Sequence, residues 1–448
     1  MNREPEMLTT TLPRACRLFQ RTSWLTLFAF AIAGLSACDN RDAGKDTRNG
    51  RTNVQSVASS ALLPLDAAAM QDRVERLGKD MLVPGAVVIL RTPKGEFKHT
   101  YGVTSYRGAT PTSFDQHMRV GSNTKTWTGT VILQMVQEGK LRLDDPVAKY
   151  RPDVPNGANI TIEQLLTMRS GLYNYSESLE LNRALDEHPQ RVWTPKQLLT
   201  VALRHPPLFA PGSKFSYSNT NTILLGLIAE QVDGKSLSDI MRDRLFRPLG
   251  LENTLFPTAT SITLPEPYTR GYMYGTNVLT LHTPALPDSL QTAARAGNLA
   301  PVDWTNASPS WTWAAGEGIS TADDLATWVR VLVIGKLLNA DMQARRLASV
   351  QQINPNDASS AWYGWGIAKF GNLYGHTGEM PGYNSFMGHD PVNNVTLVVW
   401  SNLAPAVDGR DPATTIARSL IGMLYAPEDD RDSEQTHPST ALRFGVLG

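Results

Sequence analysis

The chain has 448 residues, of which 41% are hydrophobic and 19% are charged, and its 42 acidic residues balance 42 basic ones. This length and apolar content suffice for a large domain with its own core. The even charge balance argues against the basic surface of a nucleic-acid-binding protein, so we expect no nucleic-acid partner. The 8 histidines are scattered and short-spaced cysteine ligands are lacking, so the sequence predicts no metal site.

The first 38 residues predict a lipoprotein signal peptide. A basic segment precedes an apolar run, Trp24–Ala33, that is too short to span a bilayer. The run ends at Leu-Ser-Ala-Cys, residues 35–38, which resembles the bacterial lipobox, where cleavage exposes a cysteine that carries a diacylglycerol. We therefore expect a lipid anchor on Cys38 and a bacterial envelope protein facing the periplasm or the exterior. Asp39 and Asn40 favour the inner membrane, and an ordinary signal peptide cut nearby is the alternative.

Composition divides the rest of the chain into three parts. Residues 39–65 are polar and lack periodicity, which predicts a flexible tether. We expect one folded domain over residues 66–430, with a helical lobe at about residues 120–335. Residues 431–448 are expected to form a solvated tail.

The order of the predicted elements indicates an α+β fold. The elements expected at the two ends are a helix over Asp66–Asp80, strands over Ala86–Leu90, Phe97–Val103, Tyr383–Gly388 and Val395–Trp400, and a helix opened by Asp411 and Pro412. The helices expected between them cover Ser122–Glu138, Ile162–Met168 after a Thr161 cap, the segment opened by Thr194-Pro195, and Thr321–Leu332 after a Ser320 cap.

Because strands come from both ends and helices fill the centre, we expect one antiparallel sheet formed by both chain ends with flanking helices, plus an inserted mainly helical lobe. The stretch 282–313 has no clear period, which is typical of a functional or irregular segment.

Ser122-Asn123-Thr124-Lys125 is a candidate catalytic pair. A spacing of three at the start of a predicted helix places Ser122 and Lys125 on one face, within hydrogen-bond reach. Serine needs a base, and a partly desolvated lysine of lowered pKa can serve. The helix N-terminus favours developing negative charge. Taken alone, the pattern also fits a helix-capping serine followed by an exposed lysine.

Two more patterns each occur once in the chain. Tyr217-Ser218-Asn219 combines a tyrosine that can relay a proton with an amide that can orient the lysine or bind a substrate carbonyl. His376-Thr377-Gly378 lies just ahead of a predicted strand, where exposed N–H groups can bind an oxyanion. The alternatives are a loop tyrosine with a helix-capping asparagine, and a surface turn with a satisfied histidine.

Together the three patterns resemble the serine β-lactamase and penicillin-binding-protein superfamily. The branch they resemble holds class C β-lactamases and Streptomyces-type D-alanyl-D-alanine carboxypeptidases. Flanking sequence between about residues 66 and 425 carries the same resemblance, at Arg119-Val120-Gly121, Glu138-Gly139-Lys140-Leu141, Ser170-Gly171-Leu172, Phe209-Ala210-Pro211-Gly212, Ser320-Thr321-Ala322-Asp323-Asp324-Leu325 and Pro381-Gly382-Tyr383.

The resemblance implies a β-lactamase/transpeptidase-like fold and a serine hydrolase that needs neither metal nor cofactor. Ser122 would be the acylated nucleophile, Lys125 its base and Tyr217 the proton relay. The positions matching substrate-binding residues are Asn219, His376, Thr377, Gly378 and Glu379, with the backbone N–H groups of Ser122 and Glu379 forming an oxyanion hole.

The third motif bears on the substrate. His-Thr-Gly resembles the carboxypeptidase type, in which Thr377 would help bind a terminal carboxylate. Those enzymes carry an arginine shortly after a Tyr-Gly-x-Gly segment, whereas here Lys369 follows, either as a weaker clamp or as a solvated strand residue. We expect a D-Ala-D-Ala carboxypeptidase acting on peptidoglycan stem peptides, with small peptide or acyl substrates and β-lactams as candidate ligands. The alternatives are an esterase of the same superfamily, a β-lactamase, and a non-catalytic penicillin-binding sensor.

Overall fold

The computed structural model describes residues 61–258, 260–357 and 360–426. The predicted signal peptide with Cys38, nearly all of the tether and the tail lie outside these residues. Within the described part of the chain, no helix is both long enough and apolar enough to cross a bilayer.

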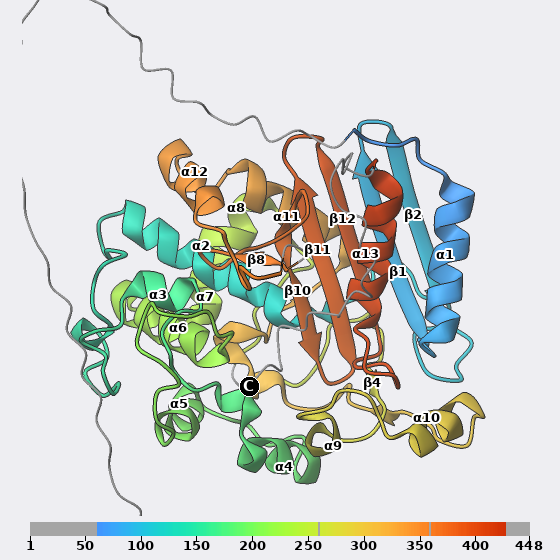
Figure 1. Cartoon of the computed structure of the whole chain (residues 1–448), viewed down its shortest axis with the longest axis horizontal. Coiled ribbons are helices and arrows are strands. Elements are labelled where there is room, and N and C mark those ends of the chain that lie inside the picture. The colour runs from blue at the N-terminus through green and yellow to red at the C-terminus, as the bar shows by residue number, and fades with distance from the viewer. Residues whose placement is uncertain (1–60, 259, 358–359, 427–448) are drawn as a thin grey trace, which may run out of the picture. The chain divides into compact units, whose positions relative to one another are not determined.

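An eight-stranded antiparallel sheet runs through the centre of the described residues (Figure 1). Its strand order is β2-β1-β12-β11-β10-β9-β8-β7, so strands from the two ends of the chain meet where β1 pairs with β12. The strands of this sheet are β1 (Gly85–Thr92), β2 (Gly95–Gly102), β7 (Gln351–Gln352), β8 (Trp362–Tyr363), β9 (Ala368–Phe370), β10 (Leu373–Met380), β11 (Tyr383–Asp390) and β12 (Val395–Ser401). Two short pairs lie apart from it, β3 (Met118–Arg119) with β6 (Ile319–Ser320) and β4 (Tyr272–Met273) with β5 (Val302–Asp303).

The helices are distributed between the ends and the middle of the chain. They are α1 (Ala67–Asp80), α2 (Thr124–Gln137), α3 (Ile162–Leu166), α4 (Leu179–Glu187), α5 (Pro195–Leu203), α6 (Asn219–Asp233), α7 (Leu237–Met241), α8 (Arg247–Leu249), α9 (Asn277–Thr280), α10 (Asp288–Arg295), α11 (Ala322–Ile334), α12 (Ala340–Ala348) and α13 (Pro412–Leu424). The predicted α+β class, with a sheet built from both chain ends and flanking helices, is confirmed.

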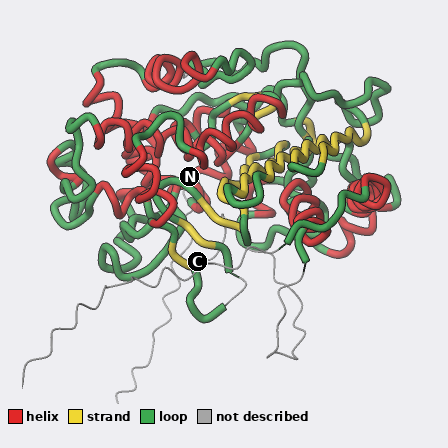
Figure 2. The backbone as a smooth tube through the Cα atoms, turned by 90° about the horizontal axis from the view of Figure 1, so that it is seen from above, coloured by secondary structure: helices red, strands yellow, loops and turns green. Residues whose placement is uncertain are grey.

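The alternation of side chains along the strands explains why both faces of the sheet are covered. On β1, Val87 and Ile89 enter the core that contains Trp127 of α2 and Trp328 of α11. The intervening Val88 enters a second core, with apolar residues of α1 and α13. Because successive residues of a strand point to opposite faces, a strand that is apolar throughout must be buried on both sides. Figure 1 shows α1 and α13 against one face, and Figure 2 shows helices on both sides of the strands.

Strand β10 is the main element that the sequence pattern missed. We expected His376, Thr377 and Gly378 ahead of a strand, but they lie inside β10 and pair with β11. The eight residues of β10 include two glycines and several polar side chains, a composition that is depleted in strands. The sheet tolerates it because β10 packs its backbone closely against the turn at residues 120–121.

Two smaller expectations also change. The cap of α11 is Thr321, whose Oγ1 accepts a hydrogen bond from the Asp324 N–H, and not Ser320, which belongs to β6. Ser320 and Thr321 are adjacent, and either hydroxyl can cap a helix, so the sequence pattern did not separate them. The stretch 282–313 is not irregular throughout, since it contains α10, β5 and a short turn at Pro309–Trp311.

A buried asparagine, Asn402, links the end of β12 to the start of β1. The Gly85 N–H donates to Asn402 Oδ1 at 2.7 Å, and the Asn402 N–H donates to the Gly85 carbonyl at 3.0 Å. Asn402 Nδ2 also donates to the Val103 carbonyl at 3.2 Å and to Thr269 Oγ1 at 3.2 Å. Asn402 is fully buried, so these bonds satisfy groups that water cannot reach.

We predict that Asn402→Ala destabilises the fold, because it leaves the buried Gly85 N–H without an acceptor. Leaving one such group without a hydrogen-bond partner costs about 1–3 kcal/mol. For a folded unit of this size, that corresponds to a fall of about 1–4 °C in Tm by thermal unfolding. Asn159→Ala, at an exposed position whose side chain bonds only locally in the described residues, is the matched control. An unchanged Tm for Asn402→Ala would contradict this account of how the chain ends are joined.

Candidate active site

Ser122 lies in a turn that leads into the buried helix α2. The turn Gly121–Asn123 is one short 3-10 turn, and α2 begins at Thr124. From Gln116 to Met135, Ser122 is the one residue that is not buried. The surrounding burial therefore exposes a single hydroxyl at the start of a helix, where free N–H groups favour negative charge.

Two glycines allow β10 to approach this turn. Gly121 has φ +54°, and a Cβ there would lie 2.7 Å from the Glu379 backbone nitrogen. A Cβ on Gly378 would lie 1.9 Å from the Val120 carbonyl oxygen. No side chain fits either gap, so these positions bring the backbone of β10 against the residue before Ser122. The Glu379 backbone nitrogen thus lies close to the serine turn. The resemblance implies that this N–H is one of the two donors of an oxyanion hole.

Lys125 places its amine beside the Ser122 hydroxyl. Lys125 Nζ lies 2.8 Å from Ser122 Oγ and donates to the Ala315 carbonyl at 2.8 Å. The side chain is 2% exposed, and its burial lowers the pKa of Lys125 well below the ordinary value of 10.5. A neutral amine at this distance can take the serine proton, which the exposed-lysine alternative could not do.

The segment that holds Ala315 is itself fastened to α2. The Thr128 hydroxyl donates to the Ala314 carbonyl at 2.8 Å, and the Gly318 N–H donates to Thr124 Oγ1 at 3.1 Å. These bonds fix the Ala315 carbonyl opposite Lys125. A backbone carbonyl has no sequence signal, so sequence reasoning missed this partner of the lysine.

Tyr217 lies on the other side of the same pair. Its ring centroid is 4.8 Å from Lys125 Nζ, and the Tyr217 side chain hydrogen bonds with that of Ser122. Burial raises the pKa of Tyr217 far above its ordinary value, and the charge of Glu379 raises it further. The phenol is therefore protonated at physiological pH, which suits a proton donor rather than a tyrosinate base.

His376 is a buried, neutral part of the support beneath Tyr217. Its ring is fully buried, and this burial is the main cause that lowers its pKa to about 3. Nδ1 lies 2.5 Å from the Thr377 carbonyl, which can only accept, so Nδ1 carries the proton. Nε2 then accepts from the Tyr363 hydroxyl at 3.2 Å. His376 is thus no surface turn, and Tyr363 is a second residue that sequence reasoning did not assign.

Asn219 does not orient the lysine through a hydrogen bond to it. Its Nδ2 donates to Ser176 Oγ at 3.0 Å, and its backbone N–H donates to Asn174 Oδ1 at 3.0 Å. The Ala315 carbonyl takes the place next to Lys125 that we had considered for the asparagine amide. Asn219 nevertheless borders the cavity above Ser122, where its amide can meet a substrate.

A small cavity of about 140 Å³ opens above Ser122. It brings Ser122, Tyr217 and Asn219 together with Glu379 and with Trp311 from the stretch 282–313. Further residues from α4, α9, β4, β10 and neighbouring loops complete its lining, namely Ser176, Asn182, Met273, Asn277, Thr280, Leu281, Met380, Pro381, Ala404 and Pro405. The cavity is smaller than the roughly 300–1,000 Å³ of sites for drug-sized ligands, which indicates a small substrate group.

Thr377 and Lys369 are not among the described residues that line this cavity. Thr377 is half-buried on β10, and its carbonyl is occupied by His376. Lys369 lies on β9 with its ammonium 5.1 Å from the ring centroid of Tyr374. This position matches the solvated strand residue that we had considered as its alternative role.

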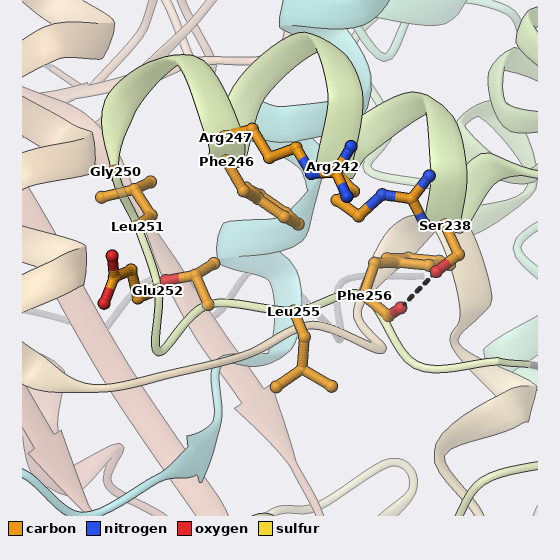
Figure 3. A pocket seen from close by; sticks show the side chains of 10 residues that line it. Ser238, Arg242, Phe246, Arg247, Gly250, Leu251, Glu252, Leu255 and Phe256 are labelled. Carbon is orange, nitrogen blue, oxygen red and sulfur yellow. Dashed lines mark hydrogen bonds between the residues drawn. The ribbon is translucent and has the colours of Figure 1, made fainter.

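A second hollow of about 390 Å³ lies away from Ser122, beside α7 and α8 (Figure 3). Arg242 and Arg247 border it together with Phe246 and Phe256. Both arginines are paired with Asp243, so this hollow presents little uncompensated positive charge. We therefore place the chemistry at Ser122. Among the described residues, no group of three or more His, Cys, Asp or Glu side chains could hold a metal ion.

Comparisons with known proteins agree with this geometry. The sequence model of the Beta-lactamase family matches residues 70–420. A D-stereospecific amidohydrolase from Streptomyces sp. is similar in structure, with a TM-score of 0.67 and 32% identity, covering 79% of this chain and 98% of that one. The D-amino acid amidase of Ochrobactrum anthropi SV3, solved with L-phenylalanine, has a TM-score of 0.64 and 25% identity, covering 78% and 96% of the two chains.

Two curated relatives are similar over a smaller share of their length. Protein flp of Staphylococcus aureus (strain MW2) is 26% identical over 331 residues, which is 72% of this chain and 60% of the relative. The putative penicillin-binding protein PbpX of Bacillus subtilis (strain 168) is 27% identical over 286 residues, 63% and 61% of the two chains. The chain therefore spans about three-fifths of the length of these relatives.

The lowered pKa of Lys125 gives a pH prediction. Protonated lysine cannot accept the serine proton, so acylation of Ser122 should rise with pH through the pKa of Lys125 and level off well below pH 10.5. His376, with a pKa of about 3, cannot produce this transition. The measurement is the rate of labelling by a fluorescent penicillin as a function of pH.

The matched variants are Lys125→Arg and Lys235→Arg. The first should lower the acylation rate by about 10²–10⁴-fold, the range of general-base effects, because a guanidinium stays protonated. The second changes an exposed lysine and should label like the wild type. A half-maximal rate near pH 10.5 would show that Lys125 is an ordinary lysine.

Proposed function

Because this chain belongs to the Beta-lactamase family, we propose that it is a serine hydrolase that cleaves amide bonds of D-amino acid derivatives through an acyl-enzyme on Ser122. The observation that carries the proposal is the 2.8 Å contact between Ser122 Oγ and the buried amine of Lys125. This contact supplies a nucleophile and a base in one place.

Acylation follows from the geometry of these two side chains. The substrate carbonyl binds above Ser122, with the backbone N–H groups of Ser122 and Glu379 as donors to its oxygen. Lys125 takes the Ser122 proton as Oγ attacks the carbonyl carbon. The tetrahedral oxyanion then forms beside the start of α2, where the helix dipole favours negative charge.

Release of the amine requires a proton donor on the leaving-group side. The phenol of Tyr217 is held protonated by burial and lies next to both Ser122 and Lys125. It passes a proton to the departing nitrogen and is reprotonated from Lys125. Water then attacks the ester carbonyl, and the reverse proton transfers free the carboxylic acid and Ser122.

The choice of D-amino acid amides rests on the solved relative at 32% identity, a D-stereospecific amidohydrolase that this chain covers almost completely. The second candidate is a D-Ala-D-Ala carboxypeptidase acting on stem peptides, which the His-Thr-Gly sequence of β10 favours. A carboxypeptidase must hold a terminal carboxylate. Lys369 stands outside the cavity and Glu379 stands in it, so the charges favour the amide hydrolase.

The predicted lipid anchor belongs to the same proposal. We propose that Cys38 carries a diacylglycerol that holds the enzyme at the bacterial envelope, facing the periplasm or the exterior. The support is the basic segment, the short apolar run and the Leu-Ser-Ala-Cys sequence at residues 35–38. At that location, peptides and amides containing D-amino acids are accessible substrates.

We predict that Ser122→Ala abolishes both labelling by fluorescent penicillin and release of ammonia from D-amino acid amides. The full chain in detergent should hydrolyse D-phenylalanine amide faster than its L-enantiomer. Ser213→Ala, an exposed serine outside the cavity, is the matched control.

The substrate panel separates the alternatives. Release of D-alanine from diacetyl-Lys-D-Ala-D-Ala well above amide turnover would make the carboxypeptidase correct. Turnover of p-nitrophenyl butyrate far above both would favour an esterase. Labelling of Ser122 without turnover of any of these substrates would leave a penicillin-binding sensor and contradict the proposed hydrolysis.

The anchor has its own test. Cys38→Ala should abolish incorporation of labelled palmitate and release the protein from the membrane fraction, because the acceptor thiol is gone. Cys16→Ala should retain both, since Cys16 precedes the predicted cleavage site. Labelled palmitate on the Cys38→Ala protein would overturn the prediction.

A further inference from the structure

The cavity above Ser122 has two walls of different chemistry. The first, which we call the asparagine wall, comes from α4, α9, the start of α6 and the turn before α4, and its residues are Ser176, Asn182, Asn219, Asn277 and Thr280. The second, which we call the sheet wall, comes from β4, the end of β10, the turn after it and the segment after β12, and its residues are Met273, Met380, Pro381, Ala404 and Pro405. The asparagine wall is polar and uncharged, whereas the sheet wall is apolar.

Two asparagines of the polar wall have their amides fixed by groups that can only accept. Asn182 Nδ2 lies 2.9 Å from the Ser176 carbonyl and 2.9 Å from the Ser178 carbonyl. Asn277 Nδ2 lies 2.8 Å from the carboxylate oxygen Oδ1 of Asp186. Because these partners offer only lone pairs, the NH₂ groups must point at them. The side-chain oxygens of Asn182 and Asn277 are therefore left to face the cavity that both residues line.

The amide of Asn219 is fixed in the same way. Asn174 Nδ2 donates to Glu177 Oε1 at 3.0 Å, so Asn174 Oδ1 accepts from the Ser176 hydroxyl at 2.9 Å. Because Ser176 Oγ already donates its proton there, it can only accept from Asn219 Nδ2, which lies 3.0 Å away. Asn219 Oδ1 is buried and accepts no hydrogen bond within the described residues. An acceptor of this kind in a cavity wall is suited to a donor on a bound substrate.

The asparagine wall thus presents acceptors to the cavity. The Thr280 hydroxyl also donates inside the protein, to the Thr276 carbonyl at 3.0 Å, so its lone pairs remain. Together with the three amide oxygens and the lone pairs of Ser176, this wall is matched to an N–H or O–H donor.

The sheet wall is held together by backbone hydrogen bonds. The Ala404 N–H donates to the Tyr272 carbonyl at 3.1 Å, and the Tyr272 N–H donates to the Gly382 carbonyl at 3.2 Å. These bonds join β4 to the turn after β10 and to the segment after β12, so the apolar residues of all three border one cavity. Such a surface binds a hydrocarbon side chain, and it leaves a buried N–H group without a partner.

We infer that Asn182 and Asn277 are specificity-determining residues that, together with Asn219, select one configuration at the α-carbon of the reacting residue. This inference rests on the proposed function and names the residues responsible for its stereospecificity. With the carbonyl held at Ser122, the accepted enantiomer directs its α-nitrogen N–H to the asparagine wall and its side chain to the sheet wall. Its mirror image exchanges the two groups, which leaves the N–H against apolar atoms and the amide oxygens against hydrocarbon.

The inference does not require a free amine. An acylated α-nitrogen still carries one N–H, which the asparagine wall can accept. A substrate with no donor at this position gains nothing from the wall in either configuration, so its two enantiomers should be bound and cleaved about equally.

The test compares enantiomers on the full chain in detergent. Ammonia release by the wild type gives kcat/KM, and titration calorimetry on Ser122→Ala gives Kd without turnover. We expect D-leucinamide to be preferred over L-leucinamide by about tenfold or more in both measurements, the size expected when polar groups lose their partners. N-acetyl-D-leucinamide should keep the preference over its enantiomer, whereas the enantiomers of 2-methoxy-4-methylpentanamide, which lack the N–H, should lose it.

The variants remove the acceptors singly. Asn277→Leu should lower the D/L ratio about tenfold, while Asp186 keeps its hydrogen bonds from the backbone N–H groups of residues 277 and 278. Asn182→Leu should lower the ratio similarly, and Asn277→Gln, which retains an amide oxygen, should restore part of it. Asn306→Leu, at an exposed position outside the cavity, is the matched control and should keep the wild-type ratio.

Three results would overturn the inference. They are a wild type with no preference between the leucinamides, an equal preference for the methoxy enantiomer pair, and an equal loss for both leucinamides in Asn182→Leu and Asn277→Leu, which would show a merely structural role. Selective binding of D-leucinamide to Ser122→Ala without ammonia release by the wild type would uphold the asparagine wall and count against the proposed hydrolysis instead.

Discussion

The buried amine of Lys125, held between Ser122 Oγ and the Ala315 carbonyl, is the contact on which the rest of the site depends. A charged ammonium in this position would cost several kcal/mol of desolvation without an anionic partner. Burial therefore lowers the pKa of the amine and favours the neutral form that can act as a base. The surrounding architecture maintains that burial: α2 is enclosed on nearly all sides, and the segment around Ala315 is fastened to it by hydrogen bonds from Thr128 and to Thr124.

The close approach of β10 completes the arrangement. Gly121 and Gly378 remove the side chains that would separate β10 from the serine turn, which brings Glu379 to the cavity. Beneath it, His376 and Tyr363 form a neutral pair that packs against the Tyr217 ring. Because burial lowers the pKa of His376 to about 3, its ring supports the tyrosine without placing a positive charge next to Lys125. The same buried environment thus sets the protonation states of the base, the proton donor and the support.

Much of this could be predicted from the sequence, and the parts that could not share a physical cause. Apolar periodicity located α1, β1, β2, β11, β12 and α13, because each of these elements packs an apolar face against the core. Strand β10 was missed because its composition serves a backbone contact with the serine turn, and the glycines and polar residues needed there do not look like a strand. The motifs identified Ser122, Lys125 and Tyr217, whereas the Ala315 carbonyl has no side chain to recognise.

The sequence pattern was weakest on the substrate side of the cavity. A motif shows which residues are present but not which of them reach the cavity. Thr377 and Lys369 lie outside the described cavity lining. Glu379, which the motif suggested only for its backbone N–H, is the charged residue in that lining. Whether a cavity binds a carboxylate or an ammonium depends on the sum of charges that reach it, and that sum requires coordinates. For this reason the preference moves from a carboxypeptidase to a hydrolase of D-amino acid amides.

The most direct test is an NMR titration of the lysine side chains. Protein carrying ¹³C-labelled lysine would be titrated between neutral pH and pH 11, with Lys125→Arg used to assign the Lys125 signal. We predict one lysine whose Cε signal titrates well below pH 10.5 and is absent from the variant. If every lysine, including Lys125, titrated near 10.5, the amine would be charged at physiological pH, and it could not serve as the base that activates Ser122.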